Sequence, residues 1–208
     1  MTLRFRLLFP AILLALALLP PASAQIAQLT PFSADMQVNS KTSHQISGKV
    51  YVSRDHMRFD MSSDQGGAIM ITNFATKTAD MLMPKQQMYM EFKADDTGKR
   101  AAMAPSIKAY RDPSNPCAYD EGATCKNLGT EQVHGRSCDH WQITDKSGKV
   151  VNVWIDKQLH FPIKSVTEDS TMELTNIQVG EPAANLFTIP PGYHKMDMSG
   201  MMQGGRSQ

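Results

Sequence analysis

Aromatic residues and cysteine are scarce in this sequence, whereas methionine is abundant. Phe, Trp and Tyr make up 7% of the 208 residues, and 3 Cys stand against 15 Met. An apolar interior with few rigid rings and many thioethers is soft and adapts to irregular shapes. A chain of this length buries a sizeable core, so disulfide stapling is optional. The methionines are therefore the compositional feature that calls for a functional explanation.

Long apolar runs are absent except at the N-terminus, where one predicts a cleavable signal peptide over residues 1–24. Arg4 and Arg6 precede an apolar stretch over residues 7–19, and small residues just before Gln25 form a cleavage site. No later stretch approaches the roughly 18 apolar residues of a membrane-spanning helix. We expect the protein to be periplasmic, or secreted where there is no outer membrane.

A surplus of positive charge is also missing. The formal net charge is +1, and removal of the 24 signal residues from 208 leaves 184 residues with 19 basic and 20 acidic groups. Nucleic-acid binding needs a clustered basic surface to neutralise phosphates. Nucleic acid is therefore excluded as a partner.

Sequence motifs of catalysis are absent as well. The chain has no G-x-S-x-G elbow, no H-E-x-x-H zinc helix, no glycine-rich phosphate loop and no Rossmann fingerprint. Its Asp and Glu residues are scattered over alternating segments, as solvated faces of strands are. We predict that the protein is not an enzyme and needs no cofactor.

The sequence does contain many short stretches in which apolar and polar residues alternate. Phe32, Ala34, Met36 and Val38 alternate with polar residues, as in a strand with one dry and one wet face. Such stretches cover residues 32–39, 46–52, 56–61, 68–74, 79–83, 88–92, 127–134, 137–145, 149–156, 162–169 and 171–179. The short links between these stretches favour an antiparallel meander. Eleven strands are more than a flat single sheet usually contains, so the sheet should curl. The fold class is mainly β, a curved antiparallel sheet that forms an incomplete, half-open barrel.

Two local features refine this prediction. Ser147-Gly148 is typical of a two-residue hairpin turn. In the last strand the apolar parity switches between Leu174 and Ile177, which predicts a β-bulge near Thr175-Asn176.

Residues 93–115 break the pattern of strands. They are polar and contain prolines, so they allow at most one short helix, around Arg100 to Met103. Such a segment is either a flap over the opening of the sheet or an ordinary surface connection. We expect one half-barrel domain over residues 25–193, followed by a flexible, Met-rich tail over residues 194–208.

The three cysteines allow one disulfide and leave one thiol. A Cys117–Cys125 bond would close a short loop and stabilise the fold by about 2.5 kcal/mol. This pairing is favoured, pairings through Cys138 stay open, and otherwise Cys138 is a buried thiol. His134, Cys138 and His140 share a strand parity, which is a weak pattern for a metal site.

The tail offers a second candidate for metal binding, because thioethers select Cu(I). Its soft ligands are His194, Met196, Met198, Met201 and Met202. A low-complexity tail without a ligand is the competing interpretation.

A stripe of Met and Phe residues is the stronger functional signal. They all fall on the predicted dry face of the first six strands, which becomes concave if the sheet curls. These candidate ligand-binding residues are Met36, Met57, Phe59, Met61, Met81, Met83, Met88, Met90 and Phe92. Flexible thioethers suit variable apolar partners such as a lipid or an acyl chain. The alternative is an ordinary core, although the sequence contains no long amphipathic helix to cover the face.

Several strings resemble a family of exported bacterial domains of unknown function, related to the periplasmic lipoprotein carriers and outer-membrane acceptors of lipoprotein localisation. They are FSADMQV, GKVYVSRDHMRFDM, LGTEQVHGRSCDHWQIT, VNVWIDKQLHFPIKS and NLFTIPPGYHKM, within residues 30–197. The matching positions are Gly129, Glu131, Gly135, Trp154, Pro162, Phe187, Pro191, Gly192 and Tyr193, most of them turn or packing positions. The resemblance implies a half-barrel whose concave face holds acyl chains under a helical lid.

The sequence departs from the carriers at two points. Residues 25–31 are too short for their N-terminal amphipathic helix, and Arg58, which matches their lid-gating arginine, has the parity of the opposite face. The resemblance therefore favours a hydrophobic ligand or a membrane surface as partner over lipoprotein transfer. A non-catalytic envelope module with a filled core, which would bind an envelope protein, is the alternative function.

Overall fold

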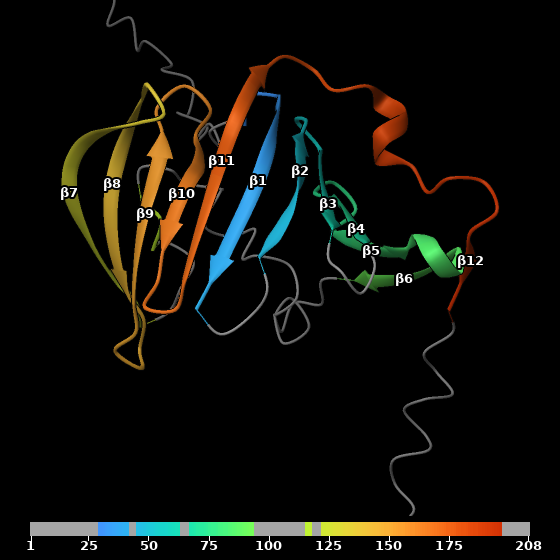
Figure 1. Ribbon diagram of the computed structural model, residues 1–208, viewed down its shortest axis with the longest axis horizontal. Helices are drawn as coiled ribbons and strands as arrows, with labels where there is room; N and C mark the ends of the chain where they lie inside the picture. The colour runs from blue at the N-terminus through green and yellow to red at the C-terminus, as the bar shows by residue number, and fades with distance from the viewer. Residues whose placement is uncertain (1–28, 42–44, 63–66, 94–114, 118–121, 197–208) are drawn as a thin grey trace, which may run out of the picture.

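The computed structural model describes residues 29–41, 45–62, 67–93, 115–117 and 122–196, and within them twelve strands form one sheet (Figure 1). The first six strands are β1 (Phe32–Ser40), β2 (Ile46–Val52), β3 (His56–Ser62), β4 (Ala68–Asn73), β5 (Thr78–Met83) and β6 (Met88–Lys93). The others are β7 (Thr124–Val133), β8 (Arg136–Thr144), β9 (Val150–Asp156), β10 (Phe161–Val166), β11 (Ser170–Val179) and β12 (His194–Lys195). The prediction of a mainly β protein is confirmed.

The sheet consists of two antiparallel meanders joined in the middle. Its order is β12-β6-β5-β4-β3-β2-β1-β11-β10-β9-β8-β7. Strands β1 to β6 each pair with the next along the chain, as do β7 to β11, and β1 pairs with β11 antiparallel. The predicted meander is therefore confirmed, and the second meander extends it on the other side of β1.

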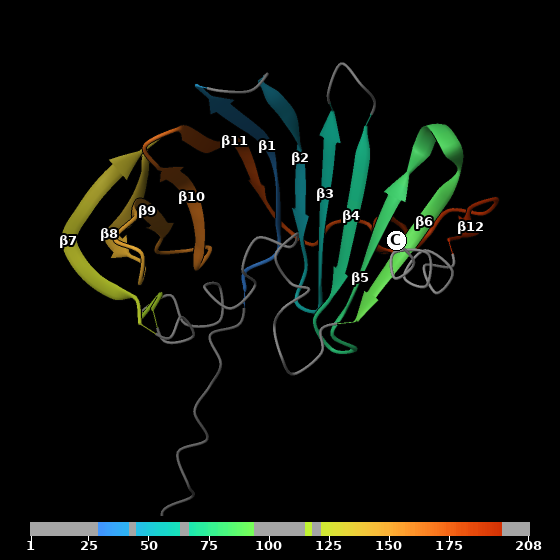
Figure 2. The same cartoon turned by 90° about the horizontal axis from the view of Figure 1, so that it is seen from below.

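The sheet is strongly bent but stays open, with β7 at one edge and β12 at the other (Figure 2). Strand β11 lies between β1 and β10 in the sheet, yet the ring centroids of Phe32 on β1 and Phe161 on β10 are 5.2 Å apart. The N–H of Thr30 also donates to the carbonyl of Leu159, in the connection between β9 and β10. Side chains converge in this way on the concave side of a sheet, so the predicted incomplete barrel is confirmed.

The main hydrophobic cluster lies on this concave side, which we call the inner face, while Ile71 and Leu82 are buried on the opposite side of the sheet. The inner face is the one that carries Phe32, Met36 and Met57, and the opposite face, with Arg58 and Asp80, is the outer face. The buried cluster of the inner face comprises Phe32, Ala34, Met36, Val50, Val52, Met57, Val133, Cys138, Leu159, Phe161, Ile163 and Leu174. Because both meanders contribute to it, this core holds the two halves of the sheet together.

Turn chemistry explains where strands end and where they bend. His134 and Gly135 both have positive φ, 49° and 77°, as a two-residue hairpin turn requires. The predicted bulge is confirmed: the register with β1 shifts, and Asn176 adopts φ 50°. One turn differs from the prediction. The N–H of Gly148 donates to the carbonyl of Asp145, so Lys146-Ser147 is the central pair instead of Ser147-Gly148.

Helices are short in the described part of the chain. The 3-10 helices η1 (Pro84–Gln86) and η4 (Ala184–Phe187) each span a single turn. Among the described residues, no helix has the length and apolar character needed to span a membrane. The helix expected around residues 100–103 and the signal peptide over residues 1–24 lie outside the described residues.

The C-terminal end of the domain differs from the expected boundary. We expected the tail to begin at residue 194, but His194 and Lys195 form β12, which pairs in parallel with β6. The remaining tail residues, 197–208, lie outside the described residues.

Candidate functional site

Strand register brings four large apolar side chains into one row on the inner face. Phe59 of β3 pairs with Met70 of β4, Met70 with Met81 of β5, and Met81 with Met90 of β6. Residues paired directly across an antiparallel ladder project from the same face, with Cβ atoms about 4.5–5.5 Å apart. The row therefore crosses four strands without a polar interruption.

Two neighbouring rows complete the surface. One contains the pairs Met61–Ala68 and Met83–Met88, and the other runs from Met57 through Thr72 to Ala79, which pairs with Phe92. The structure thus places all nine predicted ligand-binding residues on the inner face. Whether they bind a ligand stays a prediction.

Met70 belongs to the same surface and was not among the predicted residues. In Ala68 to Asn73 apolar residues occupy both parities, since Ile69 and Ile71 flank Met70. Alternation could not tell which parity faces inward there. Only the pairing of Met70 with Phe59 and Met81 assigns it.

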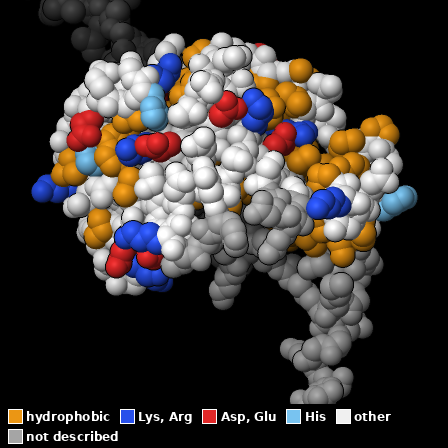
Figure 3. Space-filling view, viewed as in Figure 1, with side chains coloured by type: hydrophobic (Ala, Val, Ile, Leu, Met, Phe, Trp, Pro, Cys, Tyr) orange, Lys and Arg blue, Asp and Glu red, His pale blue; other side chains and the backbone are white. Residues whose placement is uncertain are grey.

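Exposure varies along the inner face. Met57, Met70 and Met36 are 1%, 5% and 7% exposed, so these side chains belong to the core. The partly exposed members lie at the β3–β6 end, and they are Phe59, Met61, Met81, Met83, Met88, Met90 and Phe92. Figure 3 shows hydrophobic side chains gathered at the end of the molecule that carries β5, β6 and β12. We call these seven partly exposed residues the apolar band.

A glycine allows β2 and β3 to approach closely at the edge of this surface. Gly48 pairs with both Met36 and Met61. A Cβ atom on Gly48 would lie 2.0 Å from the carbonyl oxygen of Asp60. No side chain fits there, so the row from Met36 to Met61 contains a gap at Gly48.

The outer face of β3 is polar and anchors the C-terminal segment. Arg58 donates from Nε to Asp60 Oδ1 at 2.6 Å and from a terminal nitrogen to the carbonyl of Leu186 at 2.7 Å. The Phe187 ring lies 5.5 Å from that of His56. Arg58 therefore points away from the apolar band, as its parity indicates, and holds η4 on the outer face. A cleft of about 440 Å³ opens beside this contact, lined by residues 53–56 and by part of 181–188.

A group of charges lies on the outer face behind the apolar band. Burial and the neighbouring Glu91 raise the pKa of Asp80, whose Oδ1 has no hydrogen-bond partner among the described residues. Lys195 Nζ lies 3.0 Å from Glu91 Oε1, and this hydrogen bond lowers the pKa of Glu91. The pair fastens β12 to β6.

Glu131 and Trp154, which match the resembling family, form a structural cluster with His140. Glu131 accepts from Trp154 Nε1 at 2.7 Å and contacts His140 Nδ1 at 2.9 Å, and these two bonds lower the pKa of Glu131. The imidazole stacks on the indole with centroids 4.1 Å apart, and its Nε2 contacts Asn152. Both ring nitrogens of His140 are therefore occupied.

The suggested metal triplet of His134, Cys138 and His140 gains no support from this geometry. His134 lies 3.9 Å from Glu173, and the Cys138 thiol donates to the carbonyl of Arg136. In the part of the chain that the structure describes, no group of three or more His, Cys, Asp or Glu side chains is arranged to hold a metal ion.

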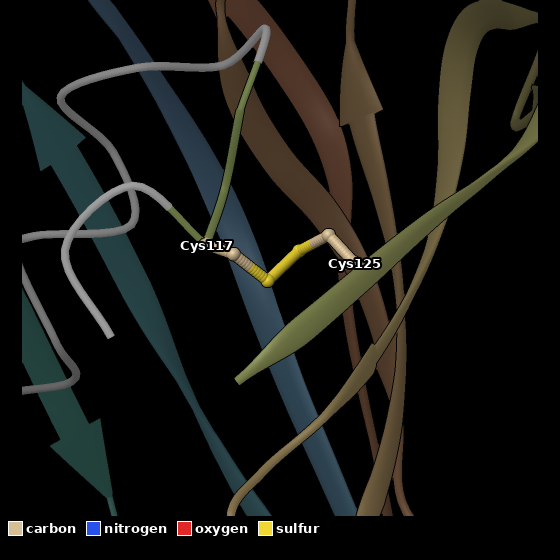
Figure 4. Close-up of a disulfide and its surroundings, with 2 residues drawn as sticks. All are labelled: Cys117 and Cys125. Atoms are coloured by element: carbon tan, nitrogen blue, oxygen red, sulfur yellow. A yellow bond between two sulfur atoms is a disulfide. The ribbon is translucent and has the colours of Figure 1, made fainter. Parts of the chain in front are cut away.

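The disulfide joins Cys117 to Cys125 at the start of β7, with Cα atoms 5.9 Å apart (Figure 4). The favoured pairing is confirmed. Cys138 remains a thiol and is fully buried, and burial together with nearby Asp156 raises its pKa to about 11. A thiol in this state is inert, which agrees with a packing role.

The metal-binding candidates of the tail are only partly described. His194 is exposed and lies beside Met88, whereas Met196 is partly buried and its N–H donates to the carbonyl of Tyr89. Met198, Met201 and Met202 lie outside the described residues.

A bent, open sheet with its core on the concave side defines the class of half-barrel proteins. Within that class, the chain belongs to the DUF4412 family, described as a domain of unknown function, whose model matches residues 33–160. The expected membership in an uncharacterised family is confirmed. No curated protein matches the chain.

Solved structures similar to this chain are distant in sequence. An uncharacterised conserved protein from Thermus thermophilus has 11% identity and a TM-score of 0.55 over 80% of this chain and 90% of that one. The MucA/MucB complex from Pseudomonas aeruginosa gives 13% identity and a TM-score of 0.51, covering 78% of this chain and 56% of that one. A LolA superfamily protein from Nitrosomonas europaea gives 7% identity, 77% and 90% coverage and a TM-score of 0.38. The first two likenesses concern the fold alone.

Proposed function

We propose that this protein is a non-catalytic, exported binding protein that holds an apolar ligand, a lipid or an acyl chain, on the apolar band. The observation that carries the proposal is a continuous row of large, flexible apolar side chains that ends in partly exposed methionines. Phe59, Met70, Met81 and Met90 follow one another in register across four strands. Water contact with such a surface is unfavourable by roughly 25 cal/mol per Å² of apolar area.

The chemistry of the band favours a flexible chain as ligand. Five of its seven members are methionines, Met61, Met81, Met83, Met88 and Met90. Unbranched thioether side chains repack around ligands of different shape at little cost. The charged groups of this region, such as Asp80 and Glu91, lie on the outer face, so the band offers a ligand no ionic partner of its own from these strands.

The first experiment is lipid extraction and native mass spectrometry of the protein purified from the compartment to which it is exported. We expect a co-purifying lipid or fatty acid, and displacement of it by a fluorescent apolar dye. Protein that carries no lipid and binds no dye would contradict the proposal.

Site-directed variants then locate the ligand. Met81→Gln with Met90→Gln makes the middle of the band polar and should weaken dye binding at least about tenfold, because two buried contacts worth about 1.4 kcal/mol or more are lost. Met81→Leu with Met90→Leu is the matched control, which keeps the apolar surface and should bind normally. If both double variants bound the dye equally well, the ligand would have to bind outside the middle of the apolar band.

A second candidate function is a structural or interaction module of the cell envelope with a filled core. The near-complete burial of Met36, Met57 and Met70 favours it, because these methionines already act as core residues. MucB, which shares the fold, was solved in complex with MucA, so this fold can host a protein partner. A protein that co-purifies stoichiometrically, without lipid, is the outcome that supports this function over the first.

A further inference from the structure

Strand β12 brings an imidazole to the end of the methionine surface. His194 pairs with Met88 in the parallel ladder between β12 and β6, and its N–H donates to the carbonyl of Gln87 at 2.8 Å. Met88 in turn pairs with Met83 on β5. Met83, Met88 and His194 therefore occupy one row across three adjacent strands, although His194 is more than a hundred residues away from both along the chain.

An ion pair on the outer face confirms which way these side chains point. Lys195 Nζ lies 3.0 Å from Glu91 Oε1, and Lys195 pairs with Tyr89. Successive residues of a strand project from opposite faces. Because Lys195 is on the outer face with Glu91, its neighbours His194 and Met196 lie on the inner face with Met88 and Met90.

The result is a grid of soft ligands, two rows deep and three strands wide. The first row is Met83, Met88 and His194, and the second is Met81, Met90 and Met196. Neighbouring strands are about 4.8 Å apart and alternate residues along a strand about 6.7 Å apart, which the flexible thioether arms can bridge. His194 is exposed, and the five methionines are partly exposed. An ion can therefore reach the grid from solvent.

The donor set determines which ion fits. Thioether sulfur is a soft, neutral ligand that selects Cu(I), and imidazole also binds copper. Ca²⁺ and Mg²⁺ need oxygen ligands, usually carboxylates. The acidic residues of these strands, Asp80 and Glu91, project from the outer face and are turned away from the grid. The grid therefore favours a soft monovalent cation over hard divalent ones.

We propose that Met83, Met88 and His194 form a Cu(I) site at the β5–β6–β12 edge, with Met90 or Met196 as the fourth ligand. The tail methionines 198, 201 and 202 are not required for it. The site goes beyond the proposed lipid function, because copper needs only this corner of the inner face. β12 would then be held to β6 by the metal as well as by its backbone hydrogen bonds.

The test is an anaerobic titration of the purified full chain with Cu(I), in competition with the chromogenic chelator bicinchoninate. We expect one equivalent of Cu(I) to be withheld from the chelator. Met83→Leu with Met88→Leu preserves the apolar volume and should weaken Cu(I) binding by at least about a hundredfold, since changes around metal ligands alone typically cost 10–100-fold. His194→Leu should weaken it as well.

Three controls make the outcome decisive. Met36→Leu with Met57→Leu changes two methionines of the same face away from the grid and should leave Cu(I) binding intact. Removal of residues 197–208 should also leave it intact, whereas loss of binding on truncation would place the site in the tail and overturn the proposal. Circular dichroism verifies that each variant folds. Dye binding by His194→Leu, at a position outside the apolar band, should stay normal, so loss of the copper site is distinguishable from loss of the lipid site.

Two results would overturn the proposal directly. The first is a wild-type chain that withholds no Cu(I) from the chelator. The second is a Met83→Leu, Met88→Leu variant that binds as tightly as the wild type. X-ray absorption at the copper edge supplies an independent readout, with sulfur and nitrogen scatterers expected in wild type and the nitrogen lost in His194→Leu.

Discussion

Gly48 lies where backbone packing leaves no room for a side chain. A methyl group there would meet the Asp60 carbonyl oxygen at 2.0 Å, and because that atom belongs to the backbone of β3, the two strands must move apart. We predict that Gly48→Ala destabilises the fold by about 1–3 kcal/mol, the usual cost of overpacking. Urea denaturation measures this loss. Ser47→Ala, at the exposed neighbouring position, is the control and should change stability by less than about 0.5 kcal/mol. Equal stability of both variants would refute the close approach.

Asp156 is a buried charge that organises the turn before β10. It is 1% exposed, pairs with Arg136, and accepts the backbone N–H groups of Gln158 and Leu159, both at 2.8 Å. Removal of one partner of a buried pair leaves the other uncompensated, at a cost of about 3–5 kcal/mol. We therefore predict a loss of that order for Asp156→Asn in chemical denaturation.

The control for Asp156 is a second aspartate with an exposed partner. Asp139 lies 3.0 Å from Lys157 Nζ, and both side chains are well exposed. Exposed ion pairs contribute about 0–1 kcal/mol to stability, so Asp139→Asn should hardly change the free energy of unfolding. If the two substitutions cost the same, burial of the Arg136–Asp156 pair has no energetic consequence.

Asp80 gives the protein a predictable pH dependence. Burial, and then the charge of Glu91, raise its pKa in the folded state, so ionised Asp80 opposes folding at neutral pH. The opposition disappears as the pH falls through this raised pKa and below the ordinary value of 3.8, where folded and unfolded forms are both protonated. Asp80→Asn should therefore raise the melting temperature at pH 7 and give no advantage near pH 3.

The size of this effect is limited by solvent, which screens a half-buried group, so we expect a gain of less than about 1 kcal/mol. Melting curves of wild type and Asp80→Asn between pH 3 and pH 7 provide the measurement. Glu91 responds in the opposite sense, because its lowered pKa stabilises the fold at higher pH. A gain that grows toward acid would contradict the assignment to Asp80.

Strand β12 is held by contacts with a strand that is distant in sequence. Two backbone N–H groups, of His194 and Met196, donate to β6 and the residue before it, and Lys195 adds its ion pair with Glu91. Elements with few buried contacts open locally before the whole fold does. We predict that Lys195→Ala speeds amide hydrogen exchange at His194 and Met196 by up to about fivefold, because an exposed ion pair contributes little stability.

The exchange of β2 and β3 is the internal reference for this experiment. Their amides are paired within the sheet centre, several strands away from β12. They should exchange at the same rate in wild type and in Lys195→Ala. Equal acceleration of all strands would mean that β12 opens only with the whole protein.

The sequence predicts those elements that depend on interactions between residues close together along the chain. Alternation fixes each long strand locally, and the parity switch after Leu174 revealed the bulge that Asn176 forms. Strand β12 could not be found in this way, since two residues carry no periodicity and their partner Met88 is far away in the chain. Met70 escaped for a different reason, because both faces of β4 are apolar. The proximity of His194 to Met83 and Met88 is likewise a product of topology alone.

At the scale of the whole molecule, an open sheet must manage two edges. Strand β7 is interrupted by a register shift at Asn127, whose side chain accepts the N–H of Gly129, and it presents mostly exposed polar residues. Bulges and polar residues of this kind oppose edge-to-edge association. The other edge is closed by β12 over part of β6. The two edges are thus protected by different means. The edge that adjoins the apolar band is protected by the two-residue strand β12.

The inner face divides the molecule into a core half and a candidate ligand half, and this division yields the last prediction. Met57 is 1% exposed within the core cluster, whereas Met83 is partly exposed at the β5–β6 end. Met57→Ala should cost about 2–5 kcal/mol of stability, as large-to-small core changes do, and leave dye binding per folded molecule unchanged.

Met83→Ala should show the opposite pattern, with a loss of stability below about 1 kcal/mol and weakened binding of an apolar dye. Denaturation curves and dye titrations on both variants test the pair together. A face that served only as a core would make both substitutions costly to stability and neither costly to binding. An open half-barrel leaves part of its concave side exposed whether or not it binds a ligand, so exposure alone does not identify a binding surface. Opposite effects of the two substitutions, on stability for Met57→Ala and on dye binding for Met83→Ala, distinguish a ligand surface from an incompletely packed core.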